Sequence, residues 1–331
     1  MAKTAMDEVD KEGAFVRTES GFRGWVKADG SSEFPVESGR YHLYVSYACP
    51  WASRCLAFRV LKGLEEHITF STVDAVMRKT RPDDPNDEHH GWVFIENEDP
   101  LHGRKSIREI YEAEKRQTHK FTVPILYDKK ENRIVSNESS EIIRMFNSEF
   151  QALIKDPVQR ERDFYPEDMR EAIDAVNEWV YTDINNGVYK CGFAKKQGAY
   201  DAAAVALFSA LDRVERTLGK QRYIAGETLS EADIRLFVTI VRFDNVYHTH
   251  FKCNKKRIID YPNLYNYIRE IYQTDRIAET VNMHHIVHHY YRSHPTVNPY
   301  GIVPLTPSAE EGFKLPHDRD RTYSHKKQKT N

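Results

Sequence analysis

The sequence predicts a two-domain α+β protein in which an α/β domain precedes an all-α helical bundle. The chain has 331 residues, which exceeds the length of a typical single domain. An alternating apolar pattern that begins at Tyr41 is typical of a strand, and a helical pattern and a second strand pattern follow it at once. Beyond about residue 150, every strong segment carries apolar residues at helical spacing. The two kinds of pattern therefore predict two domains in this order.

The domain boundaries follow shifts in composition along the chain. We expect an N-terminal arm over residues 1–40, rich in glycine, serine and charge, and an α/β domain over residues 41–150. A long polar insertion at about 74–120 interrupts the α/β domain, and insertions of this length are usually functional or disordered. The helical domain spans residues 151–292, and a proline-rich, charged tail over residues 293–331 is expected to run over the surface.

The α/β domain is predicted to contain a strand–helix–strand unit and a hairpin. The strand from Tyr41, the helix Trp51–Leu61 and the strand Ile68–Val73 are closely joined, which implies a parallel pair with a right-handed crossover. Phe121–Asp128 and Arg133–Ser136 are short apolar runs around a polar turn, which is typical of a hairpin. A helix with capping residues and acids in its first turn is expected to open directly after the hairpin.

The helical domain is predicted from segments with apolar residues at three- and four-residue spacing. The segment Ser230-Glu-Ala-Asp233 is a strong helix start, because an acceptor at the N-cap meets an acidic residue three positions on. The predicted helices are Asp168–Tyr181, Tyr200–Leu218, Ser230–Tyr247 and Asn263–Gln273.

Composition excludes several classes of function. The formal charge of -2 offers no general affinity for nucleic acid or for an anionic membrane. No stretch approaches the roughly 20 apolar residues that would span a bilayer. The amino terminus lacks the apolar region of a signal peptide, and the four cysteines have no framework spacing. We therefore expect reduced thiols in a cytoplasmic protein.

The candidate reactive residue is Cys49, which stands between a predicted strand and a predicted helix. Pro50 follows it at the first helical position, so the thiol lies at a helix N-terminus, where the helix dipole favours the thiolate. Ala52 occupies the second cysteine position of a Cys-x-x-Cys motif, and Cys55 is about 9 Å of helical rise away. The site is therefore monothiol, and an external thiol must resolve any mixed disulfide. The alternative is an inert buried cysteine, which is what we expect of the other three cysteines.

Two dipeptides and one tryptophan are further candidates. If the Val123–Pro124 bond is cis, the backbone of Val123 faces outward and can pair with a bound peptide; the alternative is an ordinary edge proline. Glu138-Ser139 at a helix start suits a zwitterion, although simple capping is the favoured interpretation of this fragment taken alone. Trp92, among charged neighbours in the insertion, is expensive to leave in water, so we expect it to cover another group.

Long motifs of this chain resemble those of the Xi class of the glutathione transferase superfamily, the glutathionyl-hydroquinone reductases. The resemblance extends from about Gly13 to Pro304 and implies a thioredoxin-like domain followed by a helical domain. The motifs that carry it are Tyr-His-Leu-Tyr-Val-Ser-x-Ala-Cys-Pro-Trp-Ala, Thr-Val-Pro-Ile-Leu-Tyr-Asp, Ile-Val-Ser-Asn-Glu-Ser-Ser-Glu-Ile-Ile-Arg-Met-Phe-Asn, Glu-Ala-Asp-Ile-Arg-Leu-Phe, Val-Arg-Phe-Asp-x-Val-Tyr and His-Phe-Lys-Cys-Asn.

The resemblance implies a glutathione site around a nucleophilic Cys49. Trp92 would lie against glutathione, the backbone of Val123 would pair with its cysteinyl residue, and Glu138 with Ser139 would hold its γ-glutamyl end. These roles come from the family and not from the spacing of the residues.

Two positions depart from the family pattern. Lys120 stands where relatives often carry arginine, so its contact with the glycyl carboxylate lacks a bidentate fork. Ser53 stands where histidine is usual, so the resemblance assigns no imidazole there.

The reaction implied by the resemblance uses glutathione as a co-substrate and a glutathionyl-hydroquinone as substrate. Cys49 would take the glutathione sulfur as a mixed disulfide, and a second glutathione would leave as oxidised glutathione. Tyr189 and Tyr290 are the positions that the family suggests for contact with the hydroquinone. The resemblance also implies a homodimer.

Three other interpretations remain open at this stage. The pairs in His284-His285-x-x-His288-His289 have metal-ligand spacing, but no acid or cysteine completes a site, so we expect no metal and favour surface or interface histidines. A thioltransferase or dehydroascorbate reductase would use the same thiol on another substrate. A non-catalytic docking module of the same fold would need no reactive thiol.

Overall fold

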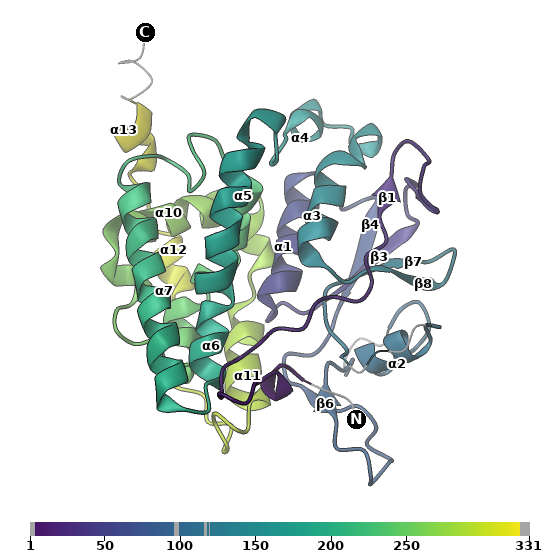
Figure 1. Cartoon of the computed structure of the whole chain (residues 1–331). Helices are drawn as coiled ribbons and strands as arrows, with labels where there is room; N and C mark the ends of the chain where they lie inside the picture. Colours follow the sequence, from purple (N-terminus) through teal and green to yellow (C-terminus); the bar gives the residue numbers. More distant parts are fainter. Residues whose placement is uncertain (1–3, 96–98, 116–117, 119, 325–331) are drawn as a thin grey trace. The chain divides into compact units, whose positions relative to one another are not determined.

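A computed structural model describes residues 4–95, 99–115, 118 and 120–324 (Figure 1). Contacts along the chain divide it into two compact units. The first unit consists of Met1–Glu8, Arg17–Asp163 and Thr280–Val303, and the second of Val9–Val16, Phe164–Glu279 and Pro304–Asn331.

The first unit is built on a four-stranded sheet with the strand order β4-β3-β7-β8 (Figure 1). β3 (Tyr41–Val45) pairs parallel with β4 (Ile68–Thr72) and antiparallel with β7 (Ile125–Asp128). β7 in turn pairs antiparallel with β8 (Arg133–Ser136). The parallel pair, joined through α1 (Pro50–Leu61), confirms the predicted strand–helix–strand unit, and β7 with β8 confirms the predicted hairpin.

The central strand β3 is buried along its whole length. His42 lies opposite Thr69 in β4, and its ring nitrogens are 2.8 Å from the Thr69 hydroxyl and 3.0 Å from the Ser71 hydroxyl. Burial lowers the pKa of His42 to about 4, so the imidazole is neutral at physiological pH. The sheet thus contains a satisfied polar group at its centre.

Helix α3 (Ser139–Ser148) follows β8 and packs beside α1 (Figure 1). It begins where the sequence predicts, because Glu138 caps its first turn. Its predicted apolar face is buried, and this face consists of Ile142, Ile143, Met145 and Phe146. Burial of that face holds the start of α3 against the domain that carries Cys49.

The arm and the insertion contribute short elements to the first unit. In the arm, β1 and β2 pair parallel, and in the insertion β5 and β6 pair antiparallel. Residues 96–98, 116, 117 and 119 of the expected insertion lie outside the described residues. The remaining elements of this unit are η1 (Ala5–Asp7), β1 (Val26–Lys27), β2 (Phe34–Pro35), β5 (Arg78–Lys79), β6 (His90–Gly91), α2 (Ile107–Glu112), η2 (Gln151–Leu153) and α4 (Pro157–Glu161).

Helix α11 (Met283–Ser293) groups with the first unit, although the sequence analysis placed it in the helical domain. The physical reason is a set of contacts to the start of the insertion. The His289 Nδ1–H donates to the carbonyl of Ala75 at 3.0 Å, and the Met77 N–H donates to the Ser293 hydroxyl at 2.9 Å. Sequence periodicity shows the helix but not the partner of its face.

The second unit is helical, as predicted. Its longest helix is α7, which matches the predicted Tyr200–Leu218 and begins three residues earlier. The elements are η3 (Glu167–Met169), α5 (Arg170–Trp179), η4 (Val180–Asn185), α6 (Gly187–Phe193), α7 (Gln197–Leu218), α8 (Glu231–Ile240), η5 (Phe243–Tyr247), α9 (His248–His250), η6 (Ile258–Asp260), α10 (Pro262–Gln273) and η7 (Ile277–Thr280), followed by α12 and α13 in the tail.

Two of the predicted helices are interrupted near their ends. The predicted segments Asp168–Tyr181 and Ser230–Tyr247 run into the π-helical turns η4 and η5. A π turn inserts an extra residue into a helix, and three- and four-residue spacing did not indicate one at the end of either segment. The predicted start at Ser230 is confirmed, because Ser230 and Asp233 form a capping box.

Residues 305–324 of the tail lie mostly at the surface of the second unit, as expected, and three of their side chains, Phe313, Arg319 and Tyr323, are buried. The tail forms α12 (Glu310–Phe313) and α13 (Arg319–Ser324). Arg319 is only 2% exposed, and its Nε lies 2.6 Å from Glu270 Oε2. The ion pair of Arg319 with Glu270 and the burial of Phe313 anchor this surface segment to the second unit.

None of the helices within the described ranges has the length and apolar character that crossing a membrane requires.

Candidate active site

Cys49 is the N-cap residue of α1, and residues 46–48 connect it to the end of β3. Its carbonyl accepts the first helical hydrogen bond from the Ser53 N–H at 3.0 Å, and Pro50 fills the first helical position, where its missing N–H removes nothing. The Cys49 side chain is 9% exposed, and its Sγ is 3.5 Å from the carbonyl oxygen of Val123. The thiol thus occupies the predicted position, at a helix N-terminus that favours the thiolate.

Ser53, which replaces the histidine usual in the family pattern, supports the same turn. Its hydroxyl donates to the Cys49 carbonyl at 3.1 Å and it is buried. Ser53 is therefore part of the first turn of α1.

Cys55 has a different environment from Cys49, although both belong to the same turn region. It is fully buried, and its thiol points to the carbonyl of Trp51 at 3.9 Å. Burial raises the pKa of Cys55 well above its ordinary value. All four cysteines are reduced. Cys55 is therefore poorly suited to resolve a disulfide at Cys49.

Val123 precedes β7 and contributes its carbonyl to the surroundings of the Cys49 thiol. The Val123–Pro124 bond is cis, which is the first of the two alternatives left open by the sequence. Cys49 and Val123 come from segments about 70 positions apart in the sequence, and the antiparallel pairing of β3 with β7 brings these segments together.

Glu138 both caps α3 and carries a charge. Its carboxylate accepts the Ser140 N–H at 2.9 Å, the Ser140 hydroxyl at 2.7 Å and the Ser20 hydroxyl at 2.9 Å. Burial raises the pKa of this carboxyl, but the hydrogen bonds from Ser140 and Ser20 and the charge of Arg54 together lower it below its ordinary value. Glu138 is therefore an anion at neutral pH.

Arg54 connects α1 with the start of α3. It is buried, its Nη1 donates to the Ser139 hydroxyl at 3.4 Å, and its guanidinium lies 4.5 Å from the centre of the Trp51 ring. In the fold it links the helix that begins at Cys49 with the helix that begins at Glu138.

Trp92 is 7% exposed and stacks on His289, with ring centroids 4.5 Å apart and planes inclined by 22°. The expectation that Trp92 covers another group is thereby confirmed. His289 was noted in the sequence only as part of a histidine cluster. Its hydrogen bond to Ala75 fixes the ring that supports Trp92.

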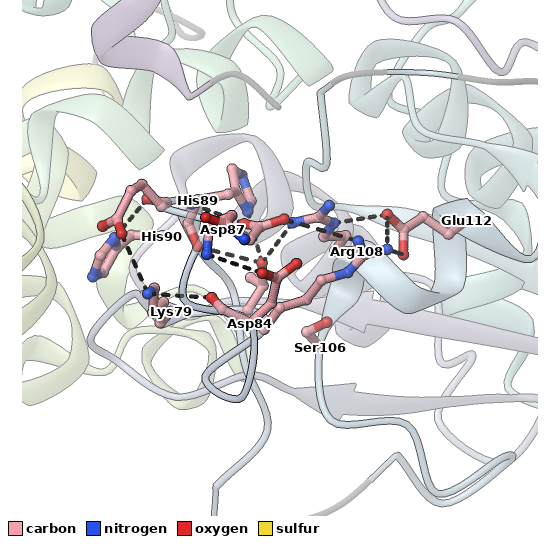
Figure 2. A network of polar contacts seen from close by, with 12 residues as sticks. Lys79, Asp84, Asp87, His89, His90, Ser106, Arg108 and Glu112 are labelled. Atoms are coloured by element: carbon pink, nitrogen blue, oxygen red, sulfur yellow. Dashed lines mark hydrogen bonds and ion pairs between the residues drawn. The ribbon is translucent and has the colours of Figure 1, made fainter. Parts of the chain in front are cut away.

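A polar network orders the insertion that carries Trp92 (Figure 2). Arg108 lies between two carboxylates, with its Nη1 2.6 Å from Asp87 and its Nε 2.7 Å from Glu112 (Figure 2). The Arg108 guanidinium carbon lies 5.6 Å from the centre of the Phe121 ring, and the centre of the His89 ring lies 5.4 Å from it. Because Phe121 is two residues before Val123, this network supports the segment next to the thiol.

Lys120 is engaged by a residue of the arm. Its ammonium lies 2.5 Å from Glu8 Oε1 and 3.4 Å from the carbonyl of Thr18. Burial lowers the pKa of Lys120, the hydrogen bond and charge of Glu8 oppose this effect, and the charge of Arg17 adds to it. The expected binding group for a glycyl carboxylate therefore already holds a carboxylate of the chain.

The two candidate tyrosines are both buried, in different units. Tyr189 lies on α6 in the second unit among aromatic rings, with Phe251 at 5.6 Å and Phe193 at 5.9 Å. Tyr290 lies on α11 in the first unit, and its ring is 5.2 Å from that of His289. Tyr290 is thus next to the residue that supports Trp92.

The histidine cluster divides between two roles. His284 and His288 stack with their ring centroids 4.1 Å apart, whereas His289 supports Trp92. In the part of the chain that the structure describes, no group of three or more histidine, cysteine, aspartate or glutamate side chains could hold a metal ion.

Comparisons with family models and with known proteins agree on the class of this protein. Residues 48–149 match the family model of the glutathione S-transferase N-terminal domain, and residues 197–270 match that of the C-terminal domain. Glutathionyl-hydroquinone reductase YqjG of Escherichia coli (strain K12) is 46% identical over 329 residues, which cover 96% of this chain and 95% of that protein. Fold and domain order therefore define a glutathione transferase, as the sequence predicts.

Solved structures narrow this class. Glutathione S-transferase Xi from Phanerochaete chrysosporium superposes with a TM-score of 0.82 and 47% identity, over 92% of this chain and 100% of that chain. The glutathione-bound structure of YqjG from Escherichia coli K-12 gives a TM-score of 0.84 and 47% identity, over 92% and 97% of the two chains. The chain belongs to the glutathione S-transferase family, in the Xi class that contains the glutathionyl-hydroquinone reductases.

Proposed function

We propose that this protein reduces glutathionyl-hydroquinones to hydroquinones at the expense of glutathione, with Cys49 as the nucleophile. The observation that carries the proposal is the position of the Cys49 thiol, at the N-terminus of α1 and next to the Val123 carbonyl. Relatives of nearly the same length carry the name of this activity, and one of them has been solved with glutathione bound.

In the first step the Cys49 thiolate attacks the sulfur of the glutathionyl-hydroquinone. A sulfur–sulfur bond forms between Cys49 and glutathione, and the bond from sulfur to the aromatic carbon breaks. The carbon leaves with the electron pair and takes up a proton, which yields the free hydroquinone. The enzyme is left as a mixed disulfide.

In the second step a thiolate of glutathione attacks this mixed disulfide. Oxidised glutathione leaves, and the Cys49 thiolate is regenerated. Because Ala52 replaces a second cysteine and Cys55 is buried with a raised pKa, the resolving thiol comes from solution. The balance is one glutathionyl-hydroquinone and one glutathione converted to one hydroquinone and one oxidised glutathione.

Glutathione is held between the starts of α1 and α3 in this proposal. Trp92 lies against the tripeptide, and the backbone of Val123 pairs with its cysteinyl residue. Glu138 receives the γ-glutamyl ammonium, and Ser139 with the N-terminus of α3 receives the neighbouring carboxylate. The anionic state of Glu138 and its place at the helix N-terminus support this assignment. No metal takes part.

The aromatic leaving group requires a proton and a surface to stack on. We assign these roles to Tyr189 and Tyr290, whose hydroxyls can donate while their rings contact the quinol. The protein is further proposed to act as a cytoplasmic homodimer, on the basis of its family and its reduced cysteines.

The test measures the release of free hydroquinone from a glutathionyl-hydroquinone in the presence of excess glutathione. Chromatography quantifies the released hydroquinone. The wild-type protein should turn over, and Cys49→Ala should lose at least about 10³-fold in rate because no nucleophile replaces the thiol. Cys55→Ala is the matched control and should retain turnover. Wild-type rates in the Cys49 variant would exclude the mechanism.

Two results would direct attention elsewhere. Glutathionylation of Cys49 without hydroquinone release would indicate a thioltransferase or dehydroascorbate reductase. A Cys49 that reacts no faster than a peptide thiol would indicate a non-catalytic docking module.

A further inference from the structure

Two cysteines of the second unit, Cys191 and Cys253, lie in contact. Cys191 belongs to α6, and Cys253 follows α9, about 60 positions further along the chain. Their thiols share a hydrogen bond, and both residues are reduced and buried, with exposed fractions of 2% and 0%. Nothing in the sequence indicates that these residues form a pair, because their spacing is that of two unrelated buried cysteines.

The backbone around the two cysteines holds them side by side. Gly192 follows Cys191, and a Cβ atom at this position would overlap the ring of Phe251, so α6 approaches Phe251 closely because Gly192 has no side chain. Lys252 has a φ of 59°, in the left-handed region, and turns the chain directly after Phe251. The Cys253 thiol lies 3.8 Å from the carbonyl of Phe251. The contact between the thiols is therefore built into the packing of α6 on this turn.

A surface hollow of about 200 Å³ begins next to the cysteine pair. Tyr200 and Asn254 line it, and Asn254 directly follows Cys253. The Tyr200 hydroxyl donates to the carbonyl of Lys252 at 2.7 Å. Burial raises the pKa of Tyr200, and the charges of Cys191 and Cys253 raise it further because both thiols are near its hydroxyl. The hollow thus leads to the residues that surround the pair.

We propose that Cys191 and Cys253 form an intramolecular disulfide when hydrogen peroxide enters through this hollow, and that the bond cross-links α6 to the segment after α9. Sulfurs in hydrogen-bond contact need only a small movement to reach bonding distance. The inference does not depend on the proposed function, since it concerns thiols that the proposed reaction does not use.

The oxidation takes two steps. One thiol, as its thiolate, attacks a peroxide oxygen, which breaks the oxygen–oxygen bond and yields a sulfenic acid and water. The thiolate of the partner cysteine then attacks the sulfenic sulfur, so that a sulfur–sulfur bond forms and the sulfur–oxygen bond breaks with release of a second water. The balance is two thiols and one hydrogen peroxide converted to one disulfide and two waters.

The cross-link would stabilise the second unit. It closes a loop over residues 191–253, which includes α7 and α8, and a closed loop of this length restricts the unfolded chain. The oxidised protein should therefore unfold at a temperature at least about 3 °C higher than the reduced protein. Dithiothreitol should reverse the increase, because it reduces the disulfide.

The experiment treats the reduced full chain with a large excess of hydrogen peroxide at neutral pH. Remaining thiols are alkylated during denaturation, and mass spectrometry of the digest should find the peptides of Cys191 and Cys253 joined. Cys191→Ala and Cys253→Ala should each lose both the joined peptides and the rise in unfolding temperature. Cys55→Ala is the matched control, because it removes a buried thiol of the first unit and should retain both.

The route through the hollow has its own variant. Val205 also lines the hollow and is 68% exposed, so Val205→Trp can fill the hollow without disturbing the core and should slow disulfide formation at least about threefold. An unchanged rate would overturn the route. Absence of the joined peptides in the wild-type protein, or joining of either cysteine to Cys49 instead, would overturn the disulfide. Equal unfolding temperatures before and after oxidation would overturn its stabilising role.

Discussion

Cys49 in the first unit and Cys253 in the second unit are both free cysteines, but their surroundings in the fold differ. In the first unit, Cys49 caps α1 and adjoins polar backbone. In the second unit, Cys253 is fully buried, with its thiol in contact with that of Cys191 and 3.8 Å from the carbonyl of Phe251. Burial, reinforced by the contact with Cys191, raises the pKa of Cys253 well above its ordinary value.

This difference shows that position decides the chemistry of a cysteine here. A helix N-terminus stabilises a thiolate, whereas an apolar interior stabilises the thiol. The comparison can be tested through reactivity, through acid stability and through the aromatic support of the site.

Thiol alkylation would break the comparison most directly. In the native chain, iodoacetamide at neutral pH should modify Cys49 at least about 100-fold faster than Cys191 or Cys253, because Cys49 lies at a helix N-terminus whereas the other two thiols are buried in the second unit. Mass spectrometry of the native chain should show one modified thiol, whereas the denatured chain should show all four. Comparable rates at Cys253 would mean that the second unit opens to the reagent.

Acid unfolding would sharpen the comparison, because each unit contains a buried histidine whose pKa is lowered by burial. Burial lowers the pKa of His42 and of His250 to about 4. Below pH 6.5 the unfolded chain therefore binds protons that the folded chain does not accept until about pH 4. The free energy of unfolding should fall across this interval by up to about 3 kcal/mol for each histidine.

Denaturant unfolding at several pH values would measure this loss. His42→Gln retains hydrogen-bonding capacity toward Thr69 and Ser71 and should flatten the pH dependence. An unchanged slope in this variant would show that His42 becomes protonated without unfolding.

The smallest expected effect concerns the stack between Trp92 and His289. His289→Phe keeps an aromatic ring beneath Trp92 but loses the hydrogen bond to Ala75, whereas His289→Ala loses both. An aromatic pair contributes about 1 kcal/mol, so His289→Ala should weaken S-methylglutathione binding by about threefold to tenfold, and His289→Phe less. Equal affinities in all three proteins, measured by calorimetry, would show that the stack does not position Trp92 for the ligand.

The sequence predicted most of the candidate site that lies at element boundaries. Cys49 and Glu138 are found at helix starts because a cap requires a local pattern that is visible in the chain itself. Arg17 and His289 were not assigned roles, because their partners, Trp51 and Trp92, are distant in sequence. For His289 the available signal was the histidine cluster, which we interpreted as surface or interface histidines, whereas His289 is buried.

The prediction of the fold is correct where the sequence pattern is regular. The structure differs from the prediction where contacts between remote residues decide the position of a segment. The sheet, its hairpin and the capping box at Ser230 follow local patterns. The grouping of α11 with the first unit and the burial of Arg319 depend on contacts with remote residues, Ala75 and Glu270. The π turns η4 and η5 each insert an extra residue into a helix, and three- and four-residue spacing did not indicate them.

The sequence by itself determined the order of elements, the family, the monothiol character and the location of one thiol at a helix start. Each of these depends on neighbours within a few positions, where backbone geometry and capping act. Tertiary structure alone decided which carboxylate meets Lys120, which ring supports Trp92 and which residue of the arm lies over the Trp51 ring. Such contacts join segments that are far apart in the chain, so only burial and packing in the folded protein select them.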